Sequence, residues 1–129
     1  MKNYKKIIEE DSNSIMKVNL PWGDLKNSKI LITGATGFIA GYLIRFLAAL
    51  SNKNKLNIMI TGTVRNLEAA KKKFKNDDFN VLNLIELSIL DEIKINEKYD
   101  YIFHMASVAS PKLFKDNPKE VVLPNTLGT

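Results

Sequence analysis

Two glycines, Gly34 and Gly37, follow a short apolar run and precede a helical pattern, an arrangement that can seat a phosphate group. Ile30–Ile32 has the uninterrupted apolar character of a strand buried on both faces. Glycine tolerates the sharp turn and the close ligand approach that the end of such a strand requires. A helix starting in this turn directs unpaired N–H groups and the positive end of its dipole toward a bound anion. The pattern therefore predicts a phosphate or pyrophosphate site.

The helix predicted over residues 38–51 would supply those N–H groups. Its apolar residues recur at helical spacing: Ile39, Tyr42, Leu43, Phe46, Leu47 and Leu50. Gly34, Thr36 and Gly37 form the turn, and the backbone N–H groups of Phe38 and Ile39 would face a pyrophosphate. No Gly-Lys-Ser/Thr follows the turn, which excludes the P-loop class of phosphate site.

Other apolar strands and helical patterns alternate along the chain, which predicts an α/β fold with a parallel sheet. Residues 1–28 read as an N-terminal extension with a short helix over Lys2–Glu10, whose apolar edge is Tyr4, Ile7 and Ile8. Residues 29–129 read as the main domain. We place its strands near 29–33, 56–64, 80–87 and 99–106, and its helices near 38–51, 67–76 and 117–127. Right-handed crossovers then give the order 3-2-1-4, with a crevice where the order reverses.

Composition narrows the class of protein. The 129 residues are 45% hydrophobic and 26% charged, which is typical of one globular domain. No segment has the length of a membrane span or the pattern of a secretory signal, so we expect no membrane partner and a cytoplasmic location. The absence of cysteine excludes disulfides and thiolate metal sites, and we expect no metal. The net charge of +5 includes the run Lys71–Lys75, which we interpret as a solvated helix face rather than a nucleic-acid site.

Four motifs in order resemble the extended short-chain dehydrogenase/reductases, the superfamily of nucleotide-sugar epimerases, dehydratases and decarboxylases. Thr33–Leu43 is similar to the TGATGFIG-x-L opening of that family, and Tyr99–Ser107 resembles its fourth strand. Ser107–Pro111 and Asn125–Thr129 are similar to the ASPASP and N-x-x-G-T elements of its decarboxylase and dehydratase branches. The resemblance covers residues 29–129. It implies a Rossmann-like domain that holds NAD or NADP across the strand ends.

The resemblance also implies which residues contact the cofactor. Ser88 and Ile89 match the pair that grips the adenine, although the family often has Asp where this chain has Ser88. The residues after the fourth strand would line the crevice beside the cofactor with backbone and small side chains: Met105, Ala106, Ser107 and Val108. Asn125 would point at the cofactor from the last helix, with helix capping as the alternative. We interpret His104 as a satisfied core residue rather than a catalyst.

Arg65 and Asn66 end the second strand, where NAD-preferring sites usually carry an acidic residue. Arginine can pair with the 2′-phosphate of NADP through its planar fork, so we favour NADP while NAD stays open. In the alternative, Arg65 is an exposed residue and Asn66 caps the next helix.

Catalysis in this family uses a Tyr-x-x-x-Lys pair, and none of the four tyrosines here has a lysine four positions later. We therefore expect no catalytic residue in this chain, which we interpret as the cofactor-binding, amino-terminal part of a larger enzyme that binds but does not turn over. The resemblance implies a dTDP- or UDP-sugar 4,6-dehydratase acting through oxidation at C4 to a keto-sugar. A 4-epimerase, a UDP-glucuronate decarboxylase and a non-catalytic NADP-binding sensor or interaction module are the alternatives. We also expect the fourth strand to be an open sheet edge. It would favour a homo-oligomer, or disorder after about Ser107.

Overall fold

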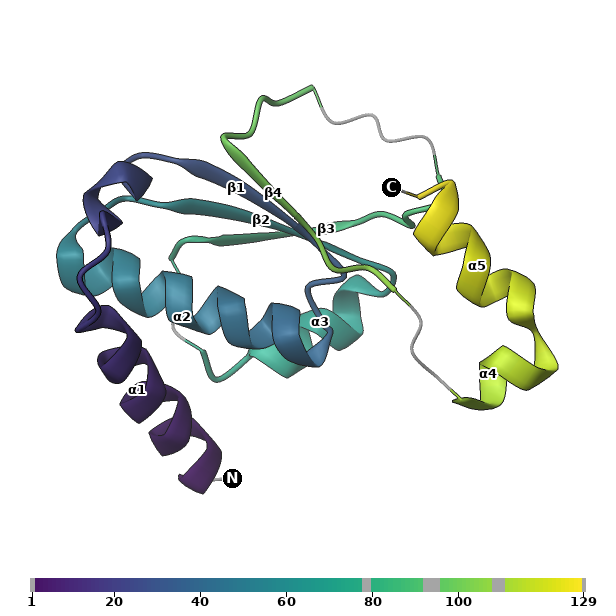
Figure 1. Cartoon of the computed structure of the whole chain (residues 1–129), viewed down its shortest axis with the longest axis horizontal. Helices are drawn as coiled ribbons and strands as arrows, with labels where there is room; N and C mark the ends of the chain where they lie inside the picture. Colours follow the sequence, from purple (N-terminus) through teal and green to yellow (C-terminus); the bar gives the residue numbers. More distant parts are fainter. Residues whose placement is uncertain (1, 78–79, 92–95, 108–110, 129) are drawn as a thin grey trace.

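The computed structural model describes residues 2–77, 80–91, 96–107 and 111–128 of the chain. Four parallel strands form one sheet in the order β3-β2-β1-β4, flanked by helices (Figure 1). The strands are β1 (Lys29–Thr33), β2 (Met59–Val64), β3 (Leu82–Glu86) and β4 (Tyr101–His104). The helices are α1 (Lys2–Met16), the 3-10 turn η1 (Trp22–Leu25), α2 (Phe38–Asn54), α3 (Leu67–Phe74), α4 (Pro111–Asp116) and α5 (Pro118–Thr126). The predicted α/β class and strand order are confirmed.

The core lies between the sheet and the two helices α2 and α3, which cover the same face of it (Figure 1). Ile30 and Ile32 of β1 are 1% and 0% exposed, as expected for a central parallel strand. Ile32 stands opposite Gly62 of β2 and Phe103 of β4 in the parallel register. The strands β1, β2 and β4 therefore have their carboxyl ends at the same edge of the sheet.

Helix α2 buries part of the apolar face that its spacing predicts: Phe46, Leu47 and Leu50 are buried, and Tyr42 and Leu43 are half-buried. Ile44 and Leu50 are fully buried against the sheet, but the side chain of Ile39 is 70% exposed. Ile39 lies in the first turn of α2. At its other end α2 closes with Lys55 in the left-handed conformation, φ 52°.

The N-terminal helix is longer than predicted. It continues past Glu10 to Met16, and it buries Ile8 and Ser12 while Tyr4 and Ile7 stay exposed. Spacing of four residues places Ile8, Ser12 and Met16 on one face, and that face packs on α2. After this helix, Trp22 packs edge-on against Phe46 with ring centroids 5.8 Å apart, anchoring the extension to the core.

Two helices lie at the carboxyl-terminal side. Helix α4 is an element that the sequence analysis did not place, whereas α5 lies within the helix predicted near residues 117–127. Both start with proline at a first-turn position, where its missing N–H has no cost. Residues 111–126 are therefore largely helical rather than disordered, and they stand beyond the carboxyl ends of the strands (Figure 1).

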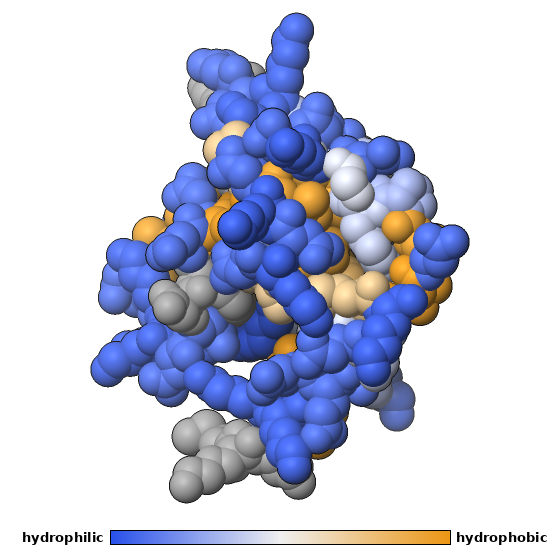
Figure 2. Space-filling view, turned by 90° about the vertical axis from the view of Figure 1, so that its left-hand side faces the viewer, coloured by the Kyte–Doolittle hydropathy of each residue, from blue (hydrophilic) through white to orange (hydrophobic). Residues whose placement is uncertain are grey.

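One face of the molecule is largely polar. At the end of the molecule opposite α5, hydrophilic side chains surround smaller apolar areas (Figure 2). Ile102 of β4, an edge strand among the described residues, is 65% exposed. None of the helices in the described ranges has the length and apolar character needed to cross a bilayer.

Candidate functional site

A cleft of about 520 Å³ opens at the carboxyl edge of the sheet. Its floor is the turn after β1 together with the residues that follow β4, and its sides are the ends of β2 and β3 and one side of α5. This is the crevice predicted from the reversal of strand order between β1 and β4. Its volume is within the range of small-molecule sites.

The floor depends on glycine at position 34. Gly34 has φ +66°, and a Cβ built there would lie 2.8 Å from Cα of Ala106 and 3.0 Å from the carbonyl oxygen of Met105. Glycine is thus required both by backbone conformation and by the close approach of the β4 extension. The N–H of Gly37 donates to the carbonyl of Gly34 at 2.8 Å, closing the turn just before α2.

A threonine hydroxyl joins β1 to the end of β4 beneath this floor. Oγ1 of Thr33 accepts hydrogen bonds from the backbone N–H groups of Met105 at 3.0 Å and Ala106 at 3.1 Å. Nδ1 of His104 lies 3.2 Å from the same oxygen. Because both hydroxyl lone pairs accept N–H groups, the remaining O–H is the group available to Nδ1. These hydrogen bonds to Thr33 fix the path of the chain from the end of β4 into the cleft.

His104 is not the core residue that the sequence predicted. Its side chain is exposed, because it lies on β4, which pairs with β1 on one side and is an edge strand in the described part of the chain. Its contact with Thr33 makes it part of the junction between β1 and β4. It is not among the residues that line the cleft.

The first turn of α2 supplies unpaired donors at the mouth of the cleft. Among the described residues, no acceptor contacts the backbone N–H groups of Phe38, Ile39 and Ala40, and Gly41 is the first to bond back, to Gly37 at 3.0 Å. The side chains of Phe38 and Ile39 are 77% and 70% exposed and do not line the cleft. Only their backbone can serve an anion, as the sequence predicts.

An exposed arginine, Arg65, stands at the end of β2. It lines the cleft and has no ion-pair or hydrogen-bond partner within the described ranges. Its neighbour Asn66 caps α3, because its side-chain oxygen accepts the N–H of Ala69 at 2.8 Å. The carboxylate of Glu86 is also committed, accepting the N–H of Leu67 at 2.9 Å. The carboxylate of Glu86, near the end of β2, therefore pairs with the backbone at the start of α3.

The far wall of the cleft comes from α5. Lys119 and Glu120 bring charge to this wall, and Leu123 and Pro124 bring apolar surface. The chain after α5 packs against Ile89, since a Cβ at Gly128 would lie 2.9 Å from Cγ1 of Ile89. The helix itself is foreseeable from Pro118, but nothing in its sequence indicates which part of the molecule it covers.

The structure brings most of the predicted site residues together. Nine line the cleft: Gly34, Thr36, Gly37, Arg65, Ser88, Ile89, Met105, Ala106 and Ser107. Phe38, Ile39, Asn66 and Asn125 do not line it, and Val108 lies outside the described residues. Asn125 donates from Nδ2 to the carbonyl of Val121 at 2.7 Å, inside its own helix. Sequence reasoning missed nine lining residues: Thr63, Val64, Leu87, Leu90, Asn117, Lys119, Glu120, Leu123 and Pro124.

The charged side chains that line the cleft, among the described residues, are the two cations Arg65 and Lys119 and the carboxylate Glu120. No tyrosine of the described ranges lines the cleft. Tyr42 donates its hydroxyl to the carboxylate of Asp11, and this bond, with burial and the nearby negative charge, raises the pKa of Tyr42 to about 12. A tyrosine that serves as a general base needs the opposite shift. Across the described residues, no group of three His, Asp or Glu side chains could hold a metal ion.

Comparison with known proteins agrees with this geometry. The model of the NAD dependent epimerase/dehydratase family matches residues 30–129. UDP-glucuronic acid decarboxylase 3 of Arabidopsis thaliana is 33% identical over 106 residues, which are 80% of this chain and 28% of that protein. UDP-glucuronic acid decarboxylase 1 of Danio rerio is 30% identical over 102 residues, 78% of this chain and 22% of that protein.

Among solved structures, Pen from Bacillus thuringiensis superposes with a TM-score of 0.60 at 23% identity. The match covers 81% of this chain and 32% of that chain, and at this identity it supports the fold alone. The chain thus spans less than a third of the length of each of these matched proteins.

Proposed function

The chain belongs to the NAD dependent epimerase/dehydratase family, and from that membership we propose that its cleft binds the dinucleotide of a nucleotide-sugar-modifying enzyme. The family implies a nicotinamide dinucleotide, which supplies hydride transfer when bound. One observation carries the proposal: the glycine turn, the N–H groups that open α2 and the exposed Arg65 meet around one cleft.

The residues present fit such a group. The floor at Gly34, Gly37 and Ala106 is backbone and small side chains, which lets a pyrophosphate approach the N–H groups that open α2. Met105 and Ser107 would lie beside the cofactor's ribose, and Ser88 and Ile89 beside its adenine. Asn125 belongs to the same proposed set through family resemblance, without support from the lining of the cleft, and so does Val108, which lies outside the described residues.

We favour NADP over NAD because of Arg65. Its guanidinium has no carboxylate partner in the described part of the chain, so it can pair with a 2′-phosphate without breaking an existing ion pair. A charge-assisted contact of this kind contributes about 1.5–3 kcal/mol, or roughly a ten- to a hundredfold gain in affinity. Lys119 adds a second cation to the same cleft.

The cofactor preference is tested by thermal shifts at matched NADP and NAD concentrations, since a ligand that binds the folded state raises its stability. Arg65→Ala should remove most of the NADP-specific shift and leave the NAD shift nearly unchanged. Lys17→Ala removes one exposed positive charge away from the cleft and should change neither shift. A wild-type chain that NAD stabilises more than NADP would contradict the role of Arg65. The absence of a shift with either cofactor would contradict the function itself.

For the whole enzyme, two reactions compete. The matched relatives are named UDP-glucuronic acid decarboxylases, which favours decarboxylation of a UDP-linked uronic acid. The sequence resemblance also supports 4,6-dehydration of a dTDP- or UDP-sugar. Both begin with oxidation at C4 of the sugar, and residues beyond those of this chain would choose between them.

Product analysis separates these reactions and a non-catalytic module. The protein that carries this chain is incubated with UDP-glucuronate or dTDP-glucose and NAD or NADP. Release of carbon dioxide supports the decarboxylase, a 4-keto-6-deoxy sugar supports the dehydratase, and binding without either product supports the module. We expect the 129-residue chain alone to give no product, because it has no Tyr-x-x-x-Lys pair.

A further inference from the structure

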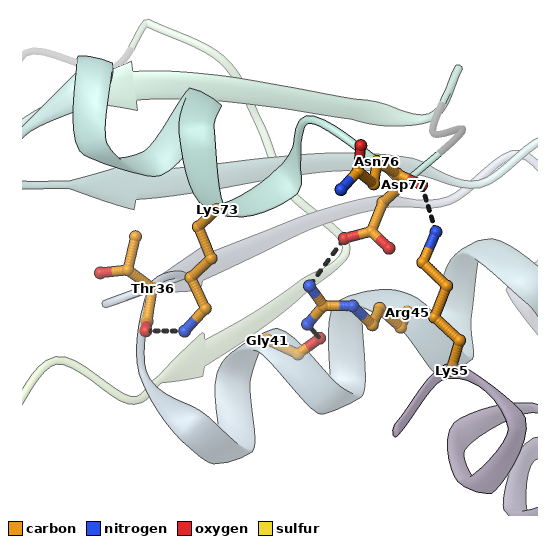
Figure 3. Close-up of polar contacts among 7 residues, drawn as sticks. All are labelled: Lys5, Thr36, Gly41, Arg45, Lys73, Asn76 and Asp77. Carbon is orange, nitrogen blue, oxygen red and sulfur yellow. Dashed lines mark hydrogen bonds and ion pairs between the residues drawn. The ribbon is translucent and has the colours of Figure 1, made fainter. Parts of the chain in front are cut away.

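The lysine-rich end of α3 does not face only solvent. Lys71 pairs with Glu68 at 3.2 Å on the exposed side of the helix, and Phe74 is buried in the core. Lys73 instead reaches across to the start of α2, where its Nζ donates to the carbonyl oxygen of Thr36 at 2.5 Å (Figure 3). One lysine of this run therefore contacts the glycine turn that borders the cleft.

The path of Lys73 crosses α2 at a glycine. A Cβ built on Gly41 would lie 3.9 Å from Cε of Lys73 and 3.2 Å from Nη1 of Arg45. The close approach of the lysine stem to the helix backbone is visible in Figure 3, where Lys73 descends from α3 toward Thr36. Because Gly41 has no side chain, the stem of Lys73 can pass close to the backbone of α2 on its way to Thr36.

This hydrogen bond completes the restraint of one peptide plane. The peptide between Thr36 and Gly37 is held at its carbonyl by Lys73 and at its N–H by the carbonyl of Gly34, 2.8 Å away. A peptide group is planar, so fixing both its polar ends fixes its orientation. The next N–H groups along the chain are the donors of Phe38 and Ile39, which no acceptor in the described ranges contacts. Only the two dihedral angles of Gly37, φ −61° and ψ 164°, separate that plane from the peptide that carries the N–H of Phe38, so the plane helps to set the direction of these donors.

We propose that Lys73 is a positioning residue for cofactor binding. It holds the carbonyl of Thr36 on the α3 side of the turn, and so keeps the N–H groups that open α2 aimed at the pyrophosphate. This role rests on the proposed dinucleotide function and adds to it a residue outside the cleft, since Lys73 does not line the cleft.

The test compares substitutions at adjacent lysines in the 129-residue chain. Lys73→Met keeps the aliphatic stem and removes the donor, and Lys73→Arg restores a donor. Lys72→Met removes the same charge from a neighbouring exposed side chain that makes no contact with the turn among the described residues. Dissociation constants are measured by calorimetry for NADP and ADP-ribose, which contain a pyrophosphate, and by NMR titration for adenosine, which does not.

We expect Lys73→Met to weaken NADP and ADP-ribose binding about three- to tenfold, in keeping with the loss of one hydrogen bond from a charged donor. Adenosine binding should be unchanged, Lys73→Arg should recover most of the loss, and Lys72→Met should stay within about twofold of wild type. Equal effects of Lys73→Met and Lys72→Met, or an equal loss for adenosine, would overturn the positioning role while leaving the proposed function intact. A wild-type chain that binds neither NADP nor ADP-ribose would overturn the function and this role with it.

Discussion

The ion pair between Arg45 and Asp77 should be the strongest charge interaction among the described residues. Nη2 of Arg45 lies 2.6 Å from Oδ2 of Asp77, and the two side chains are only 11% and 12% exposed (Figure 3). Arg45 also donates to the carbonyl of Gly41 at 3.0 Å, and its guanidinium lies 5.1 Å from the ring centre of Phe74 and 5.8 Å from that of Tyr4. One side chain thus connects α1, α2, α3 and the turn after α3.

Removing either member leaves the other charged and nearly buried. Loss of one partner of a buried pair typically costs about 3–5 kcal/mol, and each ring contact adds about 0.5–1 kcal/mol. Because both groups keep a tenth of their surface in water, we expect the lower end of that range. Arg45→Met should therefore lower the free energy of unfolding by about 3 kcal/mol. Asp77→Asn should cost less, about 1–2 kcal/mol, since the amide oxygen can still accept from Arg45.

A double-mutant cycle in urea measures the coupling, with the fluorescence of the single tryptophan, Trp22, as the probe. The matched control is Lys29–Glu97, a pair 3.4 Å apart whose side chains are 42% and 59% exposed. We expect a coupling of about 1.5–3 kcal/mol for Arg45–Asp77 and below about 1 kcal/mol for Lys29–Glu97. Equal coupling energies in the two cycles would refute the argument that burial makes the first pair strong.

Two further predictions concern the turn and α1. Gly34→Ala should lower the free energy of unfolding by about 2–4 kcal/mol in a urea titration, because alanine is strained in the left-handed conformation and its Cβ would clash with Ala106. The control is Gly23→Ala, which should change the stability little, because nothing lies within 4 Å of a Cβ at Gly23. An unchanged Gly34→Ala midpoint would contradict the described turn. The pKa of Tyr42 is raised from its ordinary value of 10.0 to about 12 in the folded chain, so the unfolded chain loses the hydroxyl proton at lower pH than the folded chain does. The hydrogen bond to Asp11 therefore stabilises the fold fully below pH 10, and this stabilisation is lost as the pH rises toward 12. The difference in urea midpoint between wild type and Tyr42→Phe should shrink between pH 9 and pH 12, a range set by those two pKa values, and a constant difference would contradict the bond to Asp11.

Local sequence signals were sufficient for the central part of the fold. The apolar run of β1 and the glycines after it place the turn, and the alternation of strands and helices gives the strand order. The predicted capping role of Asn66 is confirmed as well, because its side-chain oxygen accepts the N–H of Ala69 at the start of α3.

The remaining differences depend on contacts between distant segments. The wall formed by α5 is set by packing such as that between Gly128 and Ile89, which are far apart in the chain. The run Lys71–Lys75 looks uniformly solvated in sequence, yet burial of Phe74 fixes the helix phase that turns Lys73 toward α2. The length of α1 is likewise set by its packing on α2, which extends the helix to Met16.

The floor of the cleft has a consequence for how this protein can change over evolution or by engineering. Gly34, Gly37 and Ala106 present backbone rather than functional side chains to a ligand, and Gly34 has no room for even a methyl group. Substitutions there can abolish binding but have little capacity to redirect it. New ligand preferences must arise at the rim, where Arg65 and Lys119 can be exchanged without disturbing the packing beneath. Selection on specificity and selection on folding therefore act on separate residues of the same site.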